Sequence, residues 1–206
     1  MAEKLRLGIY GGTFSPPHLA HVRAAEAFAK AAKLDKLLII PDYLPPHKEI
    51  DGLVTANDRL EMSRLAFGHI KNAEVSDMEI LRGGRSYTYE TLEALCSSDR
   101  DLYLLCGTDM FLTLDEWKNP KRIFELSTIA YVRRESDSHL TAEILLKTEL
   151  YKQKYNARII EIPIEALELS SSLVRKNLLL RESTDLLLPK AVGEYIEERG
   201  LYRDNR

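Results

Sequence analysis

Apolar runs of strand length alternate along this chain with longer segments of helical period. Six runs are typical of strands, at residues 4–10, 36–42, 73–81, 101–107, 128–134 and 158–164. Amphipathic segments between them predict helices, at residues 22–32, 55–70, 86–96 and 139–155. The second helix starts at Thr55, and Asp58 follows three residues later, as in a capping box with Asp in place of Glu.

This alternation predicts βαβ units, because parallel strands need a crossover connection between them. We therefore expect an α/β fold, Rossmann-like and doubly wound, with a mostly parallel sheet and helices on both faces. No repeat or linker interrupts the series, so residues 1–206 should form a single domain with a C-terminal helical segment from about residue 172 onward. Ligands of such sheets bind beyond the carboxyl ends of the strands, near the point where the strand order reverses.

The amino-acid composition and net charge limit the kinds of partner that the protein can have. The chain has 206 residues, of which 45% are hydrophobic and 30% charged, enough to bury one sizeable core. It has no apolar stretch of membrane-spanning length and no apolar signal segment, so we expect a cytoplasmic protein without a membrane partner. A net charge of −3 gives no overall attraction to nucleic acid. The cysteines, Cys96 and Cys106, lack metal-ligand spacing and are interpreted as packed thiols.

The stretch GGTFSPPHLAH follows the first predicted strand and carries the main chemical signal. Gly11 and Gly12 let main-chain N–H groups approach a ligand closely where the strand ends. A helix begins near Leu19, and its N-terminus favours an anion. His18 and His21 face about the same side of its first turn and can donate hydrogen bonds to one phosphate. One histidine alone would more simply cap the helix, but two after a Gly-Gly turn favour a phosphate site.

Other phosphate and hydrolase motifs are absent from the sequence. It contains neither GxGxxG nor GxxxxGK[ST], which excludes the usual dinucleotide fingerprint and the P-loop. It also lacks a GxSxG elbow and HExxH. Phosphate chemistry would therefore depend on the histidine loop.

This loop resembles the GGTFDPxHxGH signature of the HxGH nucleotidyltransferases, which transfer the AMP portion of ATP to a phosphate-bearing acceptor. Further blocks, PDYLPPHK, RGGRSYTYETL, GTDMFLTLDEW, LSSSLVR and LPKAVGEYIEERGLY, are similar to those of bacterial nicotinate-nucleotide adenylyltransferases and follow in family order from Leu7 to Tyr202. The resemblance implies a nucleotidyltransferase that uses ATP and nicotinate mononucleotide to make deamido-NAD and pyrophosphate for NAD biosynthesis. It also implies Mg²⁺ bound mainly through the ATP phosphates, with no protein metal ligand assigned.

The resemblance also implies roles for particular residues. Those in the catalytic set are His18, His21, Lys48 and Arg175. Those expected to bind ATP are Gly11, Gly12, Thr13, Phe14, His21, Gly107, Asp109, Ser171, Ser172 and Arg175. Those expected to bind the acceptor are Ser15, Lys48, Thr88 and Trp117. Taken singly, such residues also fit plainer roles: a serine or aspartate cap, a solvated lysine or arginine, a core tryptophan.

Two positions depart from the family pattern. Ser15 stands where the family usually has Asp, and Ala20 where it usually has Gly. Both histidines are present, so we interpret the site as active. Three alternatives stay open: adenylyl transfer to nicotinamide mononucleotide, transfer to phosphopantetheine, and a nucleotide-binding sensor without turnover. Oligomeric state is also open, a homo-oligomer included.

Overall fold

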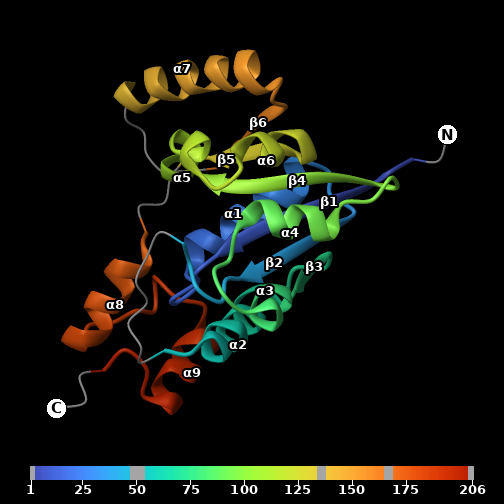
Figure 1. Ribbon diagram of the computed structural model, residues 1–206. Coiled ribbons are helices and arrows are strands. Elements are labelled where there is room, and N and C mark those ends of the chain that lie inside the picture. The colour runs from blue at the N-terminus through green and yellow to red at the C-terminus, as the bar shows by residue number, and fades with distance from the viewer. Residues whose placement is uncertain (1–2, 47–53, 134–137, 165–168, 204–206) are drawn as a thin grey trace.

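A parallel sheet crosses the centre of the molecule, in the strand order β3-β2-β1-β4-β5-β6 (Figure 1). The structure, a computed structural model, describes residues 3–46, 54–133, 138–164 and 169–203. The strands are β1 (Leu5–Gly12), β2 (Lys36–Pro41), β3 (Ala73–Val75), β4 (Arg100–Gly107), β5 (Ser127–Val132) and β6 (Ile159–Ile162). Every neighbouring pair of these strands is parallel, which confirms the predicted α/β, doubly wound class.

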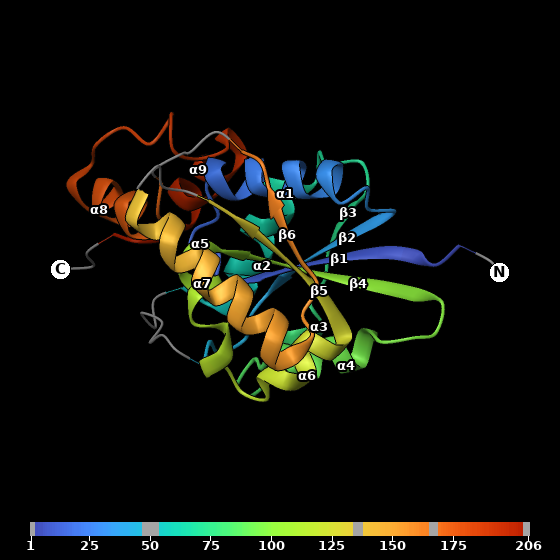
Figure 2. The same ribbon diagram turned by 90° about the horizontal axis from the view of Figure 1, so that it is seen from above.

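Helices cover both faces of the sheet, as Figure 2 shows for α1 and α9 on one side and α4 and α6 on the other. The helices are α1 (Leu19–Ala31), α2 (Ala56–Phe67), α3 (Met78–Arg82), α4 (Thr88–Leu95), α5 (Thr108–Leu112), the 3₁₀ turn η1 (Leu114–Glu116), α6 (Pro120–Leu126), α7 (Ser138–Tyr155), α8 (Ser171–Leu180) and α9 (Lys190–Arg199). The helices α1, α2, α8 and α9 pack on one apolar core, and α4 to α7 on the other.

The strands divide their side chains between these two cores because successive residues point to opposite faces. In β1, Ile9 joins the core under α4 to α7, while its neighbour Tyr10 joins the core under α1. Gly8 makes close packing of α1 possible, since a Cβ there would lie 2.3 Å from Leu34 Cδ1 and 3.0 Å from the Phe28 ring. The backbone of β1 therefore lies close to the helix that follows the histidine loop.

One predicted strand is wrong over most of its length. The run at residues 73–81 forms β3 only as far as Val75 and then turns into α3. The Ser76 hydroxyl accepts a hydrogen bond from Met78 N at 3.3 Å, a local bond that competes with continued strand pairing. By contrast, the capping box at Thr55 is confirmed: its hydroxyl accepts from Asp58 N at 3.1 Å, and Asp58 Oδ2 accepts from Thr55 N at 3.1 Å.

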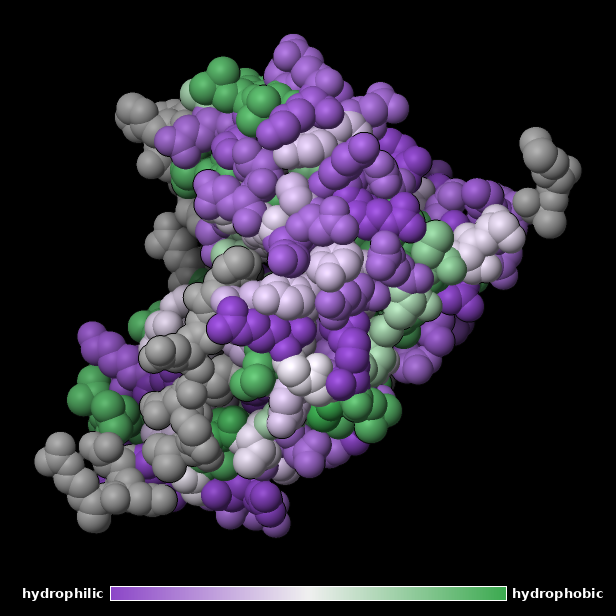
Figure 3. Space-filling view, in the orientation of Figure 1, coloured by the Kyte–Doolittle hydropathy of each residue, from purple (hydrophilic) through white to green (hydrophobic). Residues whose placement is uncertain are grey.

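The surface is mostly hydrophilic on the face seen in Figure 3, with apolar side chains gathered over α7 and α8. The exposed leucines of the chain include Leu145 and Leu146 of α7 and Leu179 and Leu180 of α8. Among the residues that the structure describes, no helix is both long and apolar enough to span a bilayer.

Candidate active site

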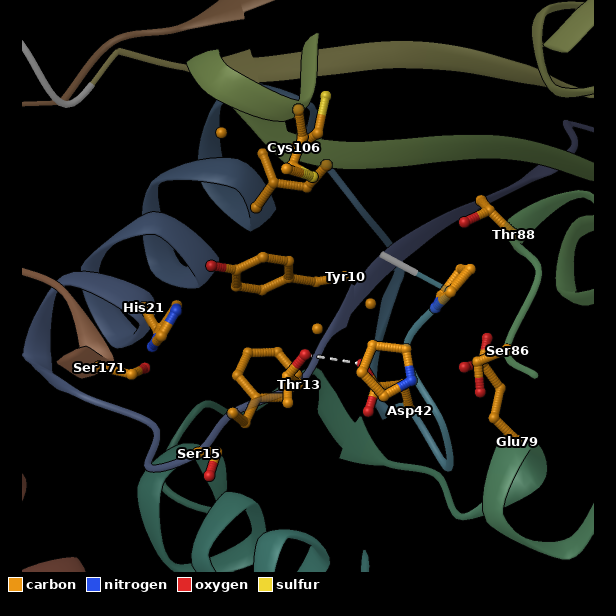
Figure 4. A pocket seen from close by; sticks show the side chains of 18 of the residues that line it. Tyr10, Thr13, Ser15, His21, Asp42, Glu79, Ser86, Thr88, Cys106 and Ser171 are labelled. Carbon is orange, nitrogen blue, oxygen red and sulfur yellow. Dashed lines mark hydrogen bonds between the residues drawn. The ribbon is translucent and has the colours of Figure 1, made fainter. Parts of the chain in front are cut away.

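A cavity of about 860 Å³ lies at the carboxyl ends of β1 and β4. The chain leaves β1 toward β2 on one side, while β4 lies on the other, so this is the expected point of reversal in the strand order. Figure 4 shows His21 and Ser171 on one side of the cavity and Thr88, Ser86 and Glu79 on the other. The residues from the sequence-based set that line it are Gly11, Gly12, Thr13, Phe14, Ser15, His18, His21, Thr88, Gly107, Asp109, Trp117, Ser171, Ser172 and Arg175. Lys48, the other member of that set, lies outside the described residues.

The two histidines stack on each other at the start of α1. Their ring centroids are 3.6 Å apart with an interplanar angle of 22°. His18 is the N-cap residue, only 1% exposed, and its main-chain N–H donates to His21 Nδ1 at 3.2 Å. Because Nδ1 of His21 accepts, a neutral His21 ring carries its proton on Nε2. This pair can therefore present a ring N–H at a helix N-terminus, where an anion is favoured.

The two glycines of the loop have different tasks. A Cβ on Gly11 would meet only Ile40 O, at 3.9 Å, so its backbone is open to a ligand. A Cβ on Gly12 would lie 3.0 Å from the Phe14 ring, so this glycine makes room for a packed aromatic side chain. Phe14 is buried edge-on against His21, with ring centroids 5.2 Å apart. Phe14 thus supports the histidine from the core, and its backbone is the part able to face a nucleotide.

A buried ion pair between Arg59 and Asp42, which sequence reasoning missed, supports the histidine loop. Arg59 of α2 is 1% exposed, and its Nη1 donates to Asp42 Oδ1 at 2.9 Å and to Thr13 O at 2.8 Å. Its Nη2 donates to Tyr43 O at 3.0 Å. The Thr13 hydroxyl donates to Asp42 Oδ2 at 2.8 Å, the bond drawn in Figure 4. The pair therefore joins α2 to the segments that follow β1 and β2. The one available signal was an aspartate at the carboxyl end of the second predicted strand.

The N-terminal end of α8 closes the loop from the other side. Ser171 Oγ donates to Pro16 O at 2.9 Å, and Arg175 Nη1 donates to Ser15 O at 2.7 Å. Arg175 Nη2 also donates to Ser172 Oγ at 3.0 Å. The predicted helix start is confirmed, and the guanidinium lies at the cavity wall with bonds to the loop backbone.

The cap of α8 is one residue earlier than the two serines considered from sequence. Ser170 is the N-cap, and its hydroxyl accepts from Leu173 N at 3.2 Å. Asp109 is likewise not the cap of its own helix: Gly107 is the N-cap of α5, and the exposed Asp109 lies on the cavity wall. Its carboxylate is therefore placed to accept hydrogen bonds from a ligand.

The opposite wall combines a helix N-terminus with an aromatic ring. Thr88 is the first residue of α4, where main-chain N–H groups have no acceptor within the helix. Trp117 is half-buried directly after η1. Asp115 fixes η1, because its Oδ1 accepts from Lys147 Nζ at 2.7 Å and Tyr151 Oη at 2.9 Å. Burial raises the pKa of Asp115, but these hydrogen bonds outweigh it and lower the pKa below its ordinary value.

Glu79 is a second buried group that sequence reasoning missed. It accepts a hydrogen bond from the Thr91 hydroxyl and lies 3.8 Å from Arg82 Nη2. Burial raises the pKa of Glu79, although bonds from Thr91 and Ser86 and the charge of Arg82 lower it in part. The Ser86 hydroxyl also accepts from Tyr43 N at 2.9 Å. This cluster links α3 and α4 to the segment after β2. Within the described residues, no group of three or more His, Cys, Asp or Glu side chains is arranged to hold a metal ion.

Known proteins match both the sequence and the fold. The profile of the cytidylyltransferase-like family matches residues 9–177. A protein of Desulfatibacillum aliphaticivorans named "Probable nicotinate-nucleotide adenylyltransferase" is 37% identical, over 96% of this chain and 100% of its own length. The chain belongs to the nicotinate-nucleotide adenylyltransferase family. A Listeria monocytogenes family member with the same name is 35% identical, over 97% of this chain and 98% of its own.

A solved structure agrees with the architecture of the family. The Plasmodium falciparum nicotinic acid mononucleotide adenylyltransferase complexed with NaAD superposes with a TM-score of 0.73, over 96% of this chain and 97% of its own. Its sequence identity of 16% makes this a likeness of fold. The resemblance drawn from the motif blocks of nicotinate-nucleotide adenylyltransferases is thus confirmed.

Proposed function

We propose that the protein transfers the adenylyl group of ATP to nicotinate mononucleotide, forming deamido-NAD and pyrophosphate. The observation that carries this proposal is one cavity with two different walls. One wall has the stacked histidines and the starts of α1 and α8, which suit phosphate groups. The other has the start of α4 and Trp117, which suit a ring bearing a carboxylate. A cytoplasmic location belongs to the same proposal.

On the phosphate wall, His21 Nε2–H donates to an oxygen of the α-phosphate beside His18. Gly11 gives the backbone room for the nucleotide, and Asp109 accepts from the ribose hydroxyls. The start of α8, with Ser171 and Ser172, binds the β- and γ-phosphates through N–H and hydroxyl groups. Mg²⁺ would enter with the triphosphate, held by its oxygens and water, and offset their negative charge.

On the acceptor wall, the N–H groups at Thr88 bind the nicotinate carboxylate at the positive end of α4. Trp117 stacks on the pyridine ring, and its position depends on η1 and thus on Asp115. From sequence, Lys48 is the residue proposed to neutralise the acceptor phosphate. The acid is favoured over the amide because hydrogen bonds to a charged acceptor are stronger, and an amide NH₂ would face other donors.

The reaction proposed is a direct in-line displacement. An oxygen of the acceptor 5′-phosphate forms a bond to the α-phosphorus of ATP, and the bond from that phosphorus to the bridging oxygen of pyrophosphate breaks. The nucleophile is already an oxyanion, so the site has to supply positioning and charge stabilisation. The histidine N–H groups stabilise the negative charge that builds on the α-phosphate oxygens.

The test is pyrophosphate release from ATP, measured with nicotinate mononucleotide, nicotinamide mononucleotide and phosphopantetheine in parallel. We expect kcat/KM for nicotinate mononucleotide to exceed that for nicotinamide mononucleotide by at least about tenfold. Equal use of both would refute the acceptor-wall assignment, and preference for phosphopantetheine would refute the acceptor class. ATP binding without release for any acceptor would favour the sensor.

A further inference from the structure

The loop that carries the histidines is held by the C-terminal part of the chain. Four hydrogen bonds join residues 15–19 to residues 171–202, which are distant in sequence but adjacent in space. They are Ser15 Oγ to Tyr202 Oη at 2.9 Å, Arg175 Nη1 to Ser15 O at 2.7 Å, Ser171 Oγ to Pro16 O at 2.9 Å, and Leu19 N to Leu187 O at 2.9 Å. Only the bond to Tyr202 involves the Ser15 side chain. This hydroxyl pair therefore restrains the side chain of Ser15, which the bonds to the loop backbone do not.

Tyr202 has an uncommon backbone conformation and lies outside any helix or strand. Its φ is +59°, in the left-handed region that bulky residues rarely occupy. Phe14, next to its partner Ser15, is also left-handed, with φ of +47°. Both Tyr202 and Ser15 line the cavity. Burial raises the pKa of Tyr202 to about 12, so its hydroxyl remains protonated at neutral pH. The hydroxyl pair therefore joins two backbone segments that each contain a left-handed residue, and such conformations persist only where surrounding contacts maintain them.

We propose that Tyr202 is a positioning residue for adenylyl transfer, acting through its hydrogen bond to Ser15 on the placement of His18 and His21. This inference rests on the proposed function. Ser15 is three residues before His18, and its carbonyl is bound by Arg175 on the opposite side of the same residue. Without the Tyr202 hydroxyl, Ser15 keeps the hydrogen bond to its carbonyl from Arg175 but loses the hydrogen bond of its side chain. The loop can then shift, and the histidine N–H groups are no longer positioned to donate hydrogen bonds to the α-phosphate.

The chain offers a matched pair of variants. Tyr202→Phe removes only the hydroxyl beside the loop. Tyr195→Phe removes a hydroxyl that donates to Asp58 Oδ1 at 3.0 Å, in a tyrosine of α9 that does not line the cavity. We expect Tyr202→Phe to lower kcat for pyrophosphate release on the order of tenfold, because small misplacements of reacting groups are costly. KM for nicotinate mononucleotide should stay unchanged, and Tyr195→Phe should keep the kcat of the unaltered protein.

Variants at Ser15 separate positioning from general stability. Ser15→Ala should reproduce the kcat loss of Tyr202→Phe, and the double variant should lose little more, because both changes break the same bond. Ser15→Asp keeps an acceptor for the tyrosine hydroxyl and should retain more activity than Ser15→Ala. Additive losses in the double variant would overturn the proposal.

Amide hydrogen exchange supplies a readout that needs no turnover. Exchange of the amide hydrogens of Ser15 and of residues 18–21 should accelerate in Tyr202→Phe and remain unchanged in Tyr195→Phe. Unchanged exchange together with unchanged kcat in Tyr202→Phe would overturn the role of this tyrosine. If the unaltered protein fails to release pyrophosphate, the proposed function fails, and so does the role of Tyr202 in positioning groups for that reaction. Faster exchange in Tyr202→Phe would then still support its hold on the loop.

Discussion

Replacing Arg59 by Met should destabilise the whole fold, although the residue lies on a surface helix. The change preserves most of the side-chain volume but removes the donors to Asp42, Thr13 O and Tyr43 O. Asp42 is itself buried and would keep only the Thr13 hydroxyl among these partners. Removing one partner of a buried ion pair costs about 3–5 kcal/mol, because the other charge remains without compensation. We expect a loss of this size in the free energy of unfolding of Arg59→Met.

Urea denaturation followed by circular dichroism measures this loss. At a slope of about 3 kcal/mol/M, the midpoint should fall by roughly 1–1.7 M urea. Arg64→Met is the matched control, since Arg64 lies on the same helix but forms an exposed pair with Glu61. Such surface pairs contribute at most about 1 kcal/mol. If the midpoints of Arg59→Met and Arg64→Met coincide, the buried pair does not stabilise the loop as argued. Adding Asp42→Asn to Arg59→Met should recover part of the lost stability, because the uncompensated negative charge of Asp42 is then removed.

The remaining predictions concern turnover, acceptor binding and acid stability. His18→Asn and His21→Asn should each lower kcat for pyrophosphate release by on the order of 10²–10³, and near-normal turnover in a folded variant would contradict their role. Trp117→Ala should raise KM for nicotinate and nicotinamide mononucleotides in similar proportion, because both rings offer similar π faces; a change in their ratio would contradict simple stacking. The lowered pKa of Asp115 means that its charge stabilises the fold above its ordinary value of 3.8, and this contribution is lost as pH falls through the lowered pKa. Asp115→Asn should therefore unfold more easily than the unaltered protein at neutral pH, with a difference that shrinks in acid; a constant difference in thermal unfolding across this range would contradict it.

Local patterns in the sequence were sufficient for the parts of the fold that depend on neighbouring residues. The apolar run of β1, the capping box at Thr55 and the helix start beside His18 all involve residues close together in sequence. The end of β3 was misjudged because Ser76 forms a side-chain bond that apolar periodicity does not reveal. In the same way, periodicity does not show that a helical arginine is buried, so Arg59 was missed.

The candidate site shows the same division. The family resemblance of the motif blocks indicated residues that do line the cavity, with Lys48 outside the described residues. It did not indicate which of them bond to each other. The contact between Ser15 and Tyr202 spans 187 residues, and the bond from Lys147 to Asp115, in the turn before Trp117, depends on the position of a later helix. Such contacts follow from tertiary packing, which a single sequence does not display.

The hold of residues 171–202 on residues 15–19 has a consequence for biosynthesis on the ribosome. Translation delivers the histidine loop well before the segment that fastens it, since the bonded residues are 155 to 187 positions apart in the chain. Contacts between such distant segments form late, because a long loop must close before they stabilise anything. A nascent or prematurely terminated chain can therefore assemble much of the sheet while its histidine loop is still unfastened. Under the roles proposed above, such incomplete chains would bind ATP poorly. They would therefore not withdraw ATP from the complete enzyme.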